Sequence, residues 1–155
     1  MNAYLEKFIS EKFKKPAKVL DLGAGKFYDV AYLKHLGWKC EGVDKLTGID
    51  LEKPYKSKKA PFDLAYSNYV LQKIKNKDTF IKTSYDNLKK DGWLFIHTFD
   101  KSDKNTRFGL DKKELSHILT SRGFTDIETE IFSFYDNDSG HKHWHRILQI
   151  TARKV

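Results

Sequence analysis

Apolar and polar residues alternate along this chain in two patterns. Compact apolar runs, such as KVLDL at 18–22 and WLFIHTF at 93–99, are typical of buried strands. Between residues 2 and 15, apolar side chains recur instead at the spacing of one helix face. Strands are predicted at 18–22, 39–44, 62–66, 93–99, 126–135 and 143–152, the last two as a terminal hairpin. Helices are predicted at 2–15, 28–36, 77–90 and 111–122.

The order of these elements predicts the fold class. Strands that alternate with helices favour a parallel sheet that is covered on both faces and has right-handed crossovers. Gly37, Gly92 and Gly123 each follow a predicted helix, where glycine suits a left-handed cap, so these are the αβ turns. In such sheets ligands bind outside the opposite, carboxyl ends of the strands. The stretch VLDLGAGKF, from Val19 to Phe27, lies at such an end.

This stretch combines a carboxylate with two glycines. Gly23 and Gly25 would let the backbone approach a ligand closely, and the helix that follows offers unpaired N–H groups. A dinucleotide fold would place a pyrophosphate there, but the G-x-G-x-x-G pattern fails because its sixth position is Tyr28. Asp21 would also repel a pyrophosphate. We therefore expect a ligand that carries positive charge near this loop.

VLDLGAGKF resembles motif I of the class I methyltransferases, which use S-adenosylmethionine and release S-adenosylhomocysteine. The resemblance covers about 18–99. It implies a Rossmann-like, doubly wound α/β fold with a mainly parallel seven-stranded sheet, helices on both faces and an antiparallel last strand. The cofactor carries an ammonium and a sulfonium but no phosphate, which suits a carboxylate at the loop. The implied cofactor site comprises Asp21, Gly23, Ala24, Gly25, Asp44, Lys45, Asp50, Leu51, Ser67, Asn68 and Tyr69.

Four further stretches carry the resemblance in the expected order. CEGVD looks like the family's second strand, whose Asp44 would accept hydrogen bonds from both ribose hydroxyls. GIDLEKPY looks like a short third strand, with Asp50 and Leu51 bordering the adenine. PFDLAYSNYVLQKI looks like the fourth strand and its turn, where residues 67–69 would line the methionine end. LKKDGWLFI looks like the helix exit and the fifth strand.

Two features depart from the family pattern. Phe27 stands where motif I commonly has a third glycine, so the turn into the helix is expected to pack differently. No helix fits between Asp44 and Asp50, which leaves that edge of the sheet short and the adenine pocket more open.

Few catalytic groups are required, because methyl transfer from a sulfonium is an in-line displacement that depends mainly on positioning. A base is needed only when the nucleophile arrives protonated. The candidates near strand ends are Tyr69, His97 and Asp100, of which Tyr69 is favoured and His97 is interpreted as a hydrogen-bonded core residue. The Pro-Pro-aromatic signature of enzymes that methylate base amines is absent after the fourth strand, where the chain reads SNYV.

The stretch DNDSGHKHWHRI contains three alternating histidines that would face one side of a strand. One interpretation is an acceptor-binding surface made of His141, His143, His145 and Arg146. A second is a metal site at the same three histidines, completed by Asp136 or Asp138. A third is a solvated hairpin, and no metal is the favoured expectation.

Length and composition limit the organisation of the chain. Its 155 residues fit one methyltransferase domain, 1–155, with an N-terminal helix (1–15), a cofactor-binding half (18–99) and a substrate-side half (100–155). No apolar run reaches the ~20 residues of a membrane span. The single cysteine, Cys40, agrees with a reducing compartment, so a cytoplasmic location is expected.

The acceptor is not named by any motif. A small molecule is favoured because no separate recognition domain fits in the chain, and the N-terminal helix and the loop DKSDKNTRFG are the candidates for a lid. The net charge of +8 leaves nucleic acid open as a partner, and hence RNA as an acceptor, although only four of the 29 basic residues are arginines. A cofactor-binding partner subunit without activity is the remaining alternative. The sequence does not indicate the oligomeric state.

Overall fold

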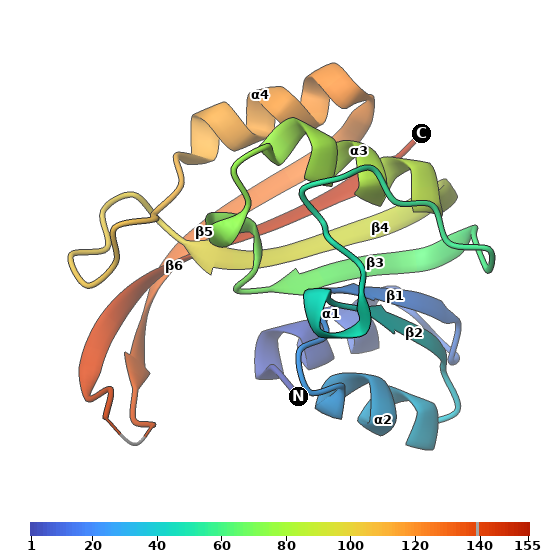
Figure 1. Ribbon diagram of the computed structural model, residues 1–155, viewed down its shortest axis with the longest axis horizontal. Coiled ribbons are helices and arrows are strands. Elements are labelled where there is room, and N and C mark those ends of the chain that lie inside the picture. Colours follow the sequence, from blue (N-terminus) through green and yellow to red (C-terminus); the bar gives the residue numbers. More distant parts are fainter. Residues whose placement is uncertain (139) are drawn as a thin grey trace.

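Six strands form one twisted sheet in the order β2-β1-β3-β4-β6-β5 (Figure 1). The structure is a computed structural model that describes residues 1–138 and 140–155. The elements in chain order are α1 (Ala3–Lys12), β1 (Lys18–Leu22), α2 (Tyr28–His35), β2 (Lys39–Val43), the 3-10 turn η1 (Lys45–Thr47), β3 (Phe62–Asn68), the 3-10 turn η2 (Leu71–Lys73), α3 (Lys77–Asn87), β4 (Leu88–Phe99), α4 (Lys112–Arg122), β5 (Phe124–Asp136) and β6 (His143–Lys154). No helix in the described part of the chain is long and apolar enough to cross a membrane.

The strand directions confirm the predicted fold class. β1 pairs in parallel with β2 and β3, and β3 pairs in parallel with β4. The last strand, β6, inserts between β4 and β5 and runs antiparallel to both. The sheet has six strands among the described residues, one fewer than expected.

The segment predicted as a short third strand, 48–55, is a loop, and that prediction is wrong. Side chains satisfy this segment in place of a strand partner. The Tyr55 hydroxyl donates to Glu41 Oε1 at 2.9 Å, and Asn87 Nδ2 donates to the Tyr55 carbonyl at 2.9 Å. Glu52 accepts hydrogen bonds from the backbone N–H groups that precede α3. With these polar groups paired in this way, the segment is held in place without a strand partner.

Two apolar cores lie on opposite faces of the sheet. Helices α3 and α4 cover one face, and α1 and α2 cover the other (Figure 1). Because strand side chains alternate, Leu20 and Leu22 of β1 enter the first core while Val19 enters the second. Asp21 shares the face of Val19, where its only polar partner in the described structure is Tyr66.

The helix exits follow the expected glycine pattern at two of three places. Gly37 and Gly123 have positive φ values of 86° and 104°. At the third exit Asp91 takes the left-handed conformation, with φ 63°, and Gly92 does not. Gly92 is required there for a different reason, since a Cβ would lie 2.9 Å from the Lys89 carbonyl oxygen.

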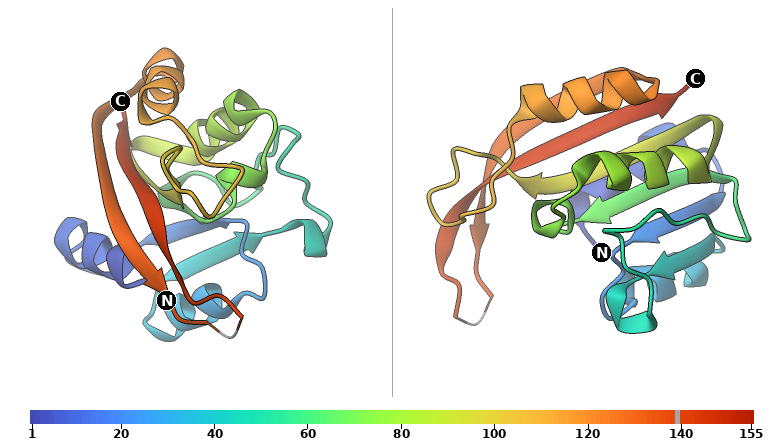
Figure 2. Two further views of the ribbon diagram at one scale, coloured as in Figure 1. Left: turned by 90° about the vertical axis from the view of Figure 1, so that its left-hand side faces the viewer. Right: turned by 45° about the horizontal axis from the view of Figure 1, so that its top comes forward.

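The β5/β6 hairpin extends well past the rest of the sheet (Figure 2). β4 pairs with β6 only as far as Ile147, whereas β5 continues to pair with β6 as far as His143. The loop after β4 supports this outer half, because Asp103 Oδ2 accepts from the Arg146 N–H at 3.0 Å and Asn105 Nδ2 donates to the Trp144 carbonyl at 2.7 Å. The loop therefore holds the hairpin in place.

Candidate functional site

The glycine loop after β1 is bonded to the end of β2. The N–H groups of Gly23 and Ala24 both donate to the Val43 carbonyl, at 2.8 and 3.0 Å. The Gly25 N–H donates to Asp44 Oδ2 at 2.9 Å. Gly25 has a φ of 53°, and no atom lies within 4 Å of the position that a Cβ would occupy. Open space therefore faces the backbone at Gly25, as a loop that cradles a ligand requires.

Asp44 holds the glycine loop in place and also caps the turn that follows β2. Its second oxygen, Oδ1, accepts from the Leu46 N–H at 2.9 Å and caps η1. Each carboxylate oxygen has a further lone pair, so the side chain can still accept hydrogen bonds from a ligand. Lys45 and Leu46 lie next to it and are exposed.

Asp21 is a buried carboxylate with an altered pKa. It is 3% exposed, and the Tyr66 hydroxyl donates to its Oδ2 at 2.8 Å. Burial, together with the negative charges of Asp29 and Asp44, raises the pKa of Asp21 to about 7, against the lowering effect of the Tyr66 hydrogen bond. A cation beside Asp21 would favour its ionised form.

A cavity of about 230 Å³ opens at this loop. It is lined by Asp21, Gly23, Ala24, Lys26, Tyr28, Asp29 and Asn68. The sequence predicted four of these residues and missed Lys26, Tyr28 and Asp29. The missed residues continue directly from the glycine motif into the first turn of α2, which was the available signal.

Other predicted cofactor residues do not line this cavity. Leu51 is 5% exposed and packs in the core beneath α3 and α4. Asp50 caps the backbone N–H of Glu52 at 3.1 Å. Ser67 is fully buried, and its hydroxyl has no hydrogen-bond partner in the described part of the chain. Contacts from these residues to a cofactor stay predictions.

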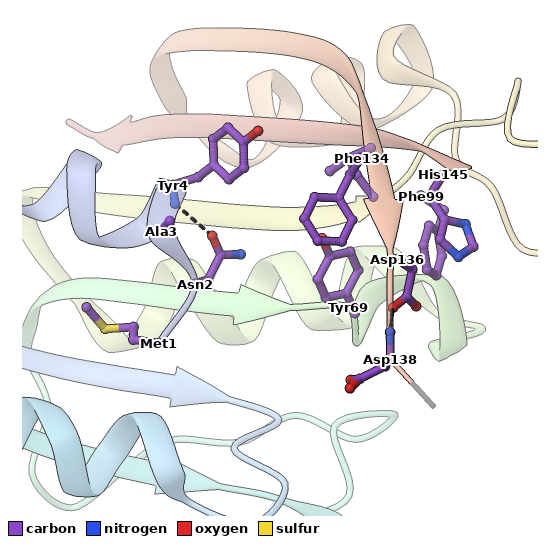
Figure 3. Close-up of a pocket in the computed structure, with 11 residues that line it drawn as sticks. Met1, Asn2, Ala3, Tyr4, Tyr69, Phe99, Phe134, Asp136, Asp138 and His145 are labelled. Carbon is purple, nitrogen blue, oxygen red and sulfur yellow. Dashed lines mark hydrogen bonds between the residues drawn. The ribbon is translucent and has the colours of Figure 1, made fainter. Parts of the chain in front are cut away.

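A larger cavity, of about 520 Å³, lies beside the first at the carboxyl ends of β3 and β4 (Figure 3). Three segments form its wall: the start of α1, the residues at the ends of β3 and β4, and the outer half of the β5/β6 hairpin. The lining residues are Met1, Asn2, Ala3, Tyr4, Tyr69, Phe99, Phe134, Asp136, Asp138, His145 and Ile147. The start of α1 thus lines the cavity as a lid would, whereas the loop DKSDKNTRFG does not.

Tyr69 is held in a strained conformation at the wall of this cavity. Its φ is 56°, and its N–H donates to the His97 carbonyl at 2.9 Å. Gln72 Nε2 donates to the Tyr69 carbonyl at 2.8 Å, and the ring packs against Phe99 with centroids 5.3 Å apart. Burial raises the pKa of Tyr69 to about 12. The phenol is therefore protonated at neutral pH and can donate a hydrogen bond to a bound molecule.

His97 is a hydrogen-bonded core residue, as interpreted from the sequence. Asn2 Nδ2, which can only donate, contacts His97 Nδ1 at 2.8 Å, so the Nε2–H must donate to Gln149 Oε1 at 2.7 Å. Burial lowers the pKa of His97, which keeps the ring neutral. Asp100 is 4% exposed and caps the Ser102 N–H at 2.9 Å. These contacts assign structural roles to both side chains.

The three alternating histidines do lie in one row. The ring centroids of His141 and His143 are 5.7 Å apart, and those of His143 and His145 are 4.5 Å apart. Only His145 lines the large cavity. Its Nδ1 lies 2.7 Å from Oδ2 of Asp103, and its Nε2 lies 2.9 Å from Nε2 of His143. Asp103 is a residue that the sequence did not reveal, because its partner is 42 positions away.

Arg146 turns away from the cavity and bonds to Ser133 Oγ at 3.1 Å. Within residues 1–138 and 140–155, no three His, Cys, Asp or Glu side chains are placed to hold a metal ion. The geometry therefore gives the metal interpretation of His141, His143 and His145 no support.

The residues at the small cavity fit the cofactor that the sequence resemblance implies. Three carboxylates, those of Asp21, Asp29 and Asp44, lie on or beside the open glycine loop, against one lysine in the cavity lining, Lys26, and the Met1 ammonium 3.6 Å from Asp29. Such a set is suited to a ligand with an ammonium and a sulfonium, and it would oppose a pyrophosphate. The carboxylates at the glycine loop and at the end of β2 therefore favour a positively charged ligand.

Comparison with known structures shows the fold. An N1-methyltransferase of 1,6-didemethyltoxoflavin from Burkholderia thailandensis is 21% identical, with a TM-score of 0.71 over 96% of this chain and 76% of that chain. An S-adenosylmethionine-dependent methyltransferase from Archaeoglobus fulgidus is 17% identical, with a TM-score of 0.73 over 98% and 92%. Phosphoethanolamine N-methyltransferase 2 from Haemonchus contortus is 17% identical, with a TM-score of 0.74 over 99% of this chain and 52% of that chain.

No curated protein sequence matches the chain. A family model described as a methyltransferase domain matches residues 2–146. As the motif I resemblance predicted, the chain belongs to this methyltransferase-domain family.

Proposed function

We propose that the protein transfers the methyl group of S-adenosylmethionine to a small-molecule acceptor that binds in the large cavity. One observation carries the proposal. Asn68 and Tyr69, consecutive residues at the end of β3, line the small and the large cavity respectively. The two cavities thus adjoin at the end of β3, and a transfer between two bound molecules requires sites that adjoin.

The chain's own residues divide the work. When bound, S-adenosylmethionine supplies a methyl group activated by a positively charged sulfur. Asp21 and Asp29 would face its ammonium in the small cavity, Gly25 would leave room for it at the loop, and Asp44 would accept hydrogen bonds from its ribose. The Tyr69 phenol, which is protonated at neutral pH, can donate or accept a hydrogen bond on the acceptor side.

The acceptor class is supported by the dimensions and lining of the large cavity. A volume of about 520 Å³ lies within the ordinary range for small-molecule sites. Two of the solved structures above are, by name, methyltransferases of small molecules. The acidic side chains at the cavity oppose entry of RNA, whose phosphates are negative.

We also propose that 1–155 acts as one methyltransferase domain, because both halves of the chain line the large cavity. Cys40, the only cysteine, is free and buried, which supports the proposed cytoplasmic setting.

Calorimetric titration of the purified protein with S-adenosylmethionine, S-adenosylhomocysteine and NAD tests the cofactor. Saturable binding of the first two without the third is expected, and Asp44→Ala should abolish it. Because Asp44 also caps the glycine loop, a thermal melt of the variant must show that it is folded. Release of S-adenosylhomocysteine with small-molecule acceptors then tests turnover. Absence of cofactor binding would refute the proposal, and binding without turnover would favour the partner-subunit alternative.

A further inference from the structure

We infer that the acceptor is an amine, which enters the large cavity as an ammonium and loses its proton to the His143/His145 pair before it is methylated. The inference rests on the proposed function, since it assigns a substrate class to the same cavity. Three features of the described residues carry it: the aromatic wall, the sign of the charge and the paired histidines.

The wall of the cavity presents four aromatic rings, those of Tyr4, Tyr69, Phe99 and Phe134. Tyr4 and Phe134 are 39% and 42% exposed, although both are large hydrophobic side chains. The faces of such rings attract organic cations, most strongly where the site is shielded from water. The wall therefore favours a molecule with a positively charged or apolar group near the rings.

The charges at the cavity decide between a positively charged group and an apolar group. Asp136 and Asp138 line it, and the Asp138 N–H donates to Asp136 Oδ1 at 3.0 Å, which folds the strand end so that both carboxylates belong to the cavity (Figure 3). The chain has 29 lysines and arginines, yet none of them lines this cavity. The terminal ammonium of Met1 lies 3.6 Å from Asp29, so an opposite charge accompanies it.

This charge pattern favours a cation over a neutral or negative acceptor. An ammonium would meet the carboxylates of Asp136 and Asp138 and the aromatic faces together. A carboxylate or a phosphate in the same place would be repelled. Because the protein as a whole is basic, the acidic cavity does not follow from its composition.

An ammonium cannot attack a methyl group until it loses a proton, and the histidines offer a place for that proton. His145 lines the cavity and directs Nδ1 at the buried carboxylate of Asp103. Asp103 also accepts from the Arg146 N–H, so the loop fixes its position. The remaining neighbours are the Phe99 ring, with its centroid 4.6 Å from that of His145, and His143.

The pair can take up one proton without breaking its hydrogen bonds. In the neutral pair, His145 Nδ1–H donates to Asp103 and His143 Nε2–H donates to His145 Nε2. Both nitrogens of His145 are already in hydrogen bonds, so an added proton enters at Nδ1 of His143, and the proton between the rings then moves to His145. The positive charge then rests beside the Asp103 carboxylate, which stabilises it.

The step is balanced as follows. The ammonium gives one proton, through water, to Nδ1 of His143, which lies next to His145 but does not line the cavity, and the nitrogen gains a free lone pair. That lone pair forms the nitrogen–carbon bond as the carbon–sulfur bond breaks, and the electrons of the broken bond stay on sulfur. The products are a methylated ammonium and neutral S-adenosylhomocysteine. Asp103 acts here as a positioning residue.

Three probes that share a phenylethyl group and differ in the end group test the substrate class: phenethylamine, 2-phenylethanol and 3-phenylpropionate. Their binding to the protein saturated with S-adenosylhomocysteine is measured by NMR titration. We expect the amine to bind at least about tenfold more tightly than the other two. The double variant Asp136→Asn/Asp138→Asn should remove this preference, while Asp126→Asn, at the opposite end of β5, should retain it. Equal binding of the three probes, a preference for the carboxylate or no binding would overturn the inference.

Turnover tests the histidine pair. With a panel of primary and secondary arylalkylamines, mass spectrometry should detect the N-methylated products. His145→Gln should lower kcat at least about a hundredfold and leave the Kd of S-adenosylhomocysteine within about twofold. His117→Gln, an exposed histidine on α4, is the matched control and should leave kcat unchanged. No N-methylated product from any amine, or unchanged kcat in His145→Gln, would overturn this step. Calorimetry of S-adenosylhomocysteine on the same samples separates these outcomes from a failure of the proposed function, in which the cofactor product would not bind.

Discussion

Binding of the cofactor should depend on pH through Asp21. Burial and the neighbouring carboxylates of Asp29 and Asp44 raise the pKa of Asp21 to about 7, so without ligand much of it is protonated near neutral pH. A ligand ammonium beside it would favour the ionised form. Binding is therefore coupled to release of a proton from Asp21, and affinity should rise as the pH rises toward 8.

The size of the effect follows from this pKa. If Asp21 is ionised in the complex, the Kd is inversely proportional to the fraction of free protein in which Asp21 is ionised. That fraction is about one in eleven at pH 6 and about ten in eleven at pH 8. The affinity should therefore increase about tenfold between pH 6 and pH 8 and level off above pH 8.

The same shift affects the stability of the free protein. The pKa of Asp21 is higher in the folded chain than its ordinary value of 3.8, so the folded state holds the proton more tightly. Stability from this group is fully present below about pH 4 and is lost as the pH rises to about 7, by at most about 4 kcal/mol. Cofactor binding should therefore be strongest above about pH 7, in the pH range where Asp21 stabilises the free protein least.

Calorimetric titration with S-adenosylhomocysteine at several pH values measures the first effect. Repeating it at pH 6 in buffers of different ionisation enthalpy should show release of nearly one proton for each ligand bound. Asp21→Asn cannot ionise, so its affinity should be lower and flat between pH 6 and pH 8. A flat profile in the unmodified protein, or a slope that persists in Asp21→Asn, would refute the reasoning.

Three further predictions concern packing and turnover. In Gly42→Ala, the new Cβ would lie 2.7 Å from Ala24 Cβ, so we expect a loss of about 1–3 kcal/mol in chemical denaturation, and an unchanged midpoint would contradict the close packing behind the loop. Asn2→Ala removes the α1 cap and the donor to His97 and should cost about 2 kcal/mol, whereas Asn2→Asp, which keeps the cap, should cost less; equal losses would exclude a role for the cap, and no loss in Asn2→Asp would exclude a role for the donor. Tyr69→Phe should lower kcat about tenfold and leave the Kd of S-adenosylhomocysteine unchanged, and the reverse pattern would move Tyr69 to the cofactor side.

Most of the fold follows from local pattern in the sequence. The apolar runs are short and the helices amphipathic, so alternation of the two fixes a layered sheet with little ambiguity. The segment 48–55 resembles a strand in sequence, but the backbone of Tyr55 bonds to the side chains of Thr83 and Asn87 and not to a neighbouring strand. Those partners lie on other elements and leave no trace near the segment itself.

The candidate site divides in the same way. The small cavity is built mainly from residues within one turn of the glycine motif, so a local motif could predict most of it. The large cavity joins the start of α1, the ends of two strands and a hairpin near the end of the chain, and no local pattern connects them. Asp103 shows the limit most clearly, because a single loop aspartate is ordinary until its contact with His145 is known.

The separation of the two cavities has a consequence for specificity. Asn2 uses its side-chain oxygen to cap α1 and its amide nitrogen to bond Asn68 and His97, at 3.2 and 2.8 Å, so α1 begins at a fixed point above β3 and β4. Tyr4 stacks on Phe132 of β5 with centroids 4.4 Å apart, which joins the helix to the hairpin. The contacts of Asn2 and Tyr4 therefore hold this wall of the large cavity against the sheet, and none of them involves the glycine loop. The helix start also reaches the small cavity, because Asn2 bonds to Asn68 and the Met1 ammonium lies 3.6 Å from Asp29, so changes there would affect both cavities. Residues of the hairpin can differ in size and charge while the glycine loop stays intact, so we expect acceptor choice to vary through the hairpin.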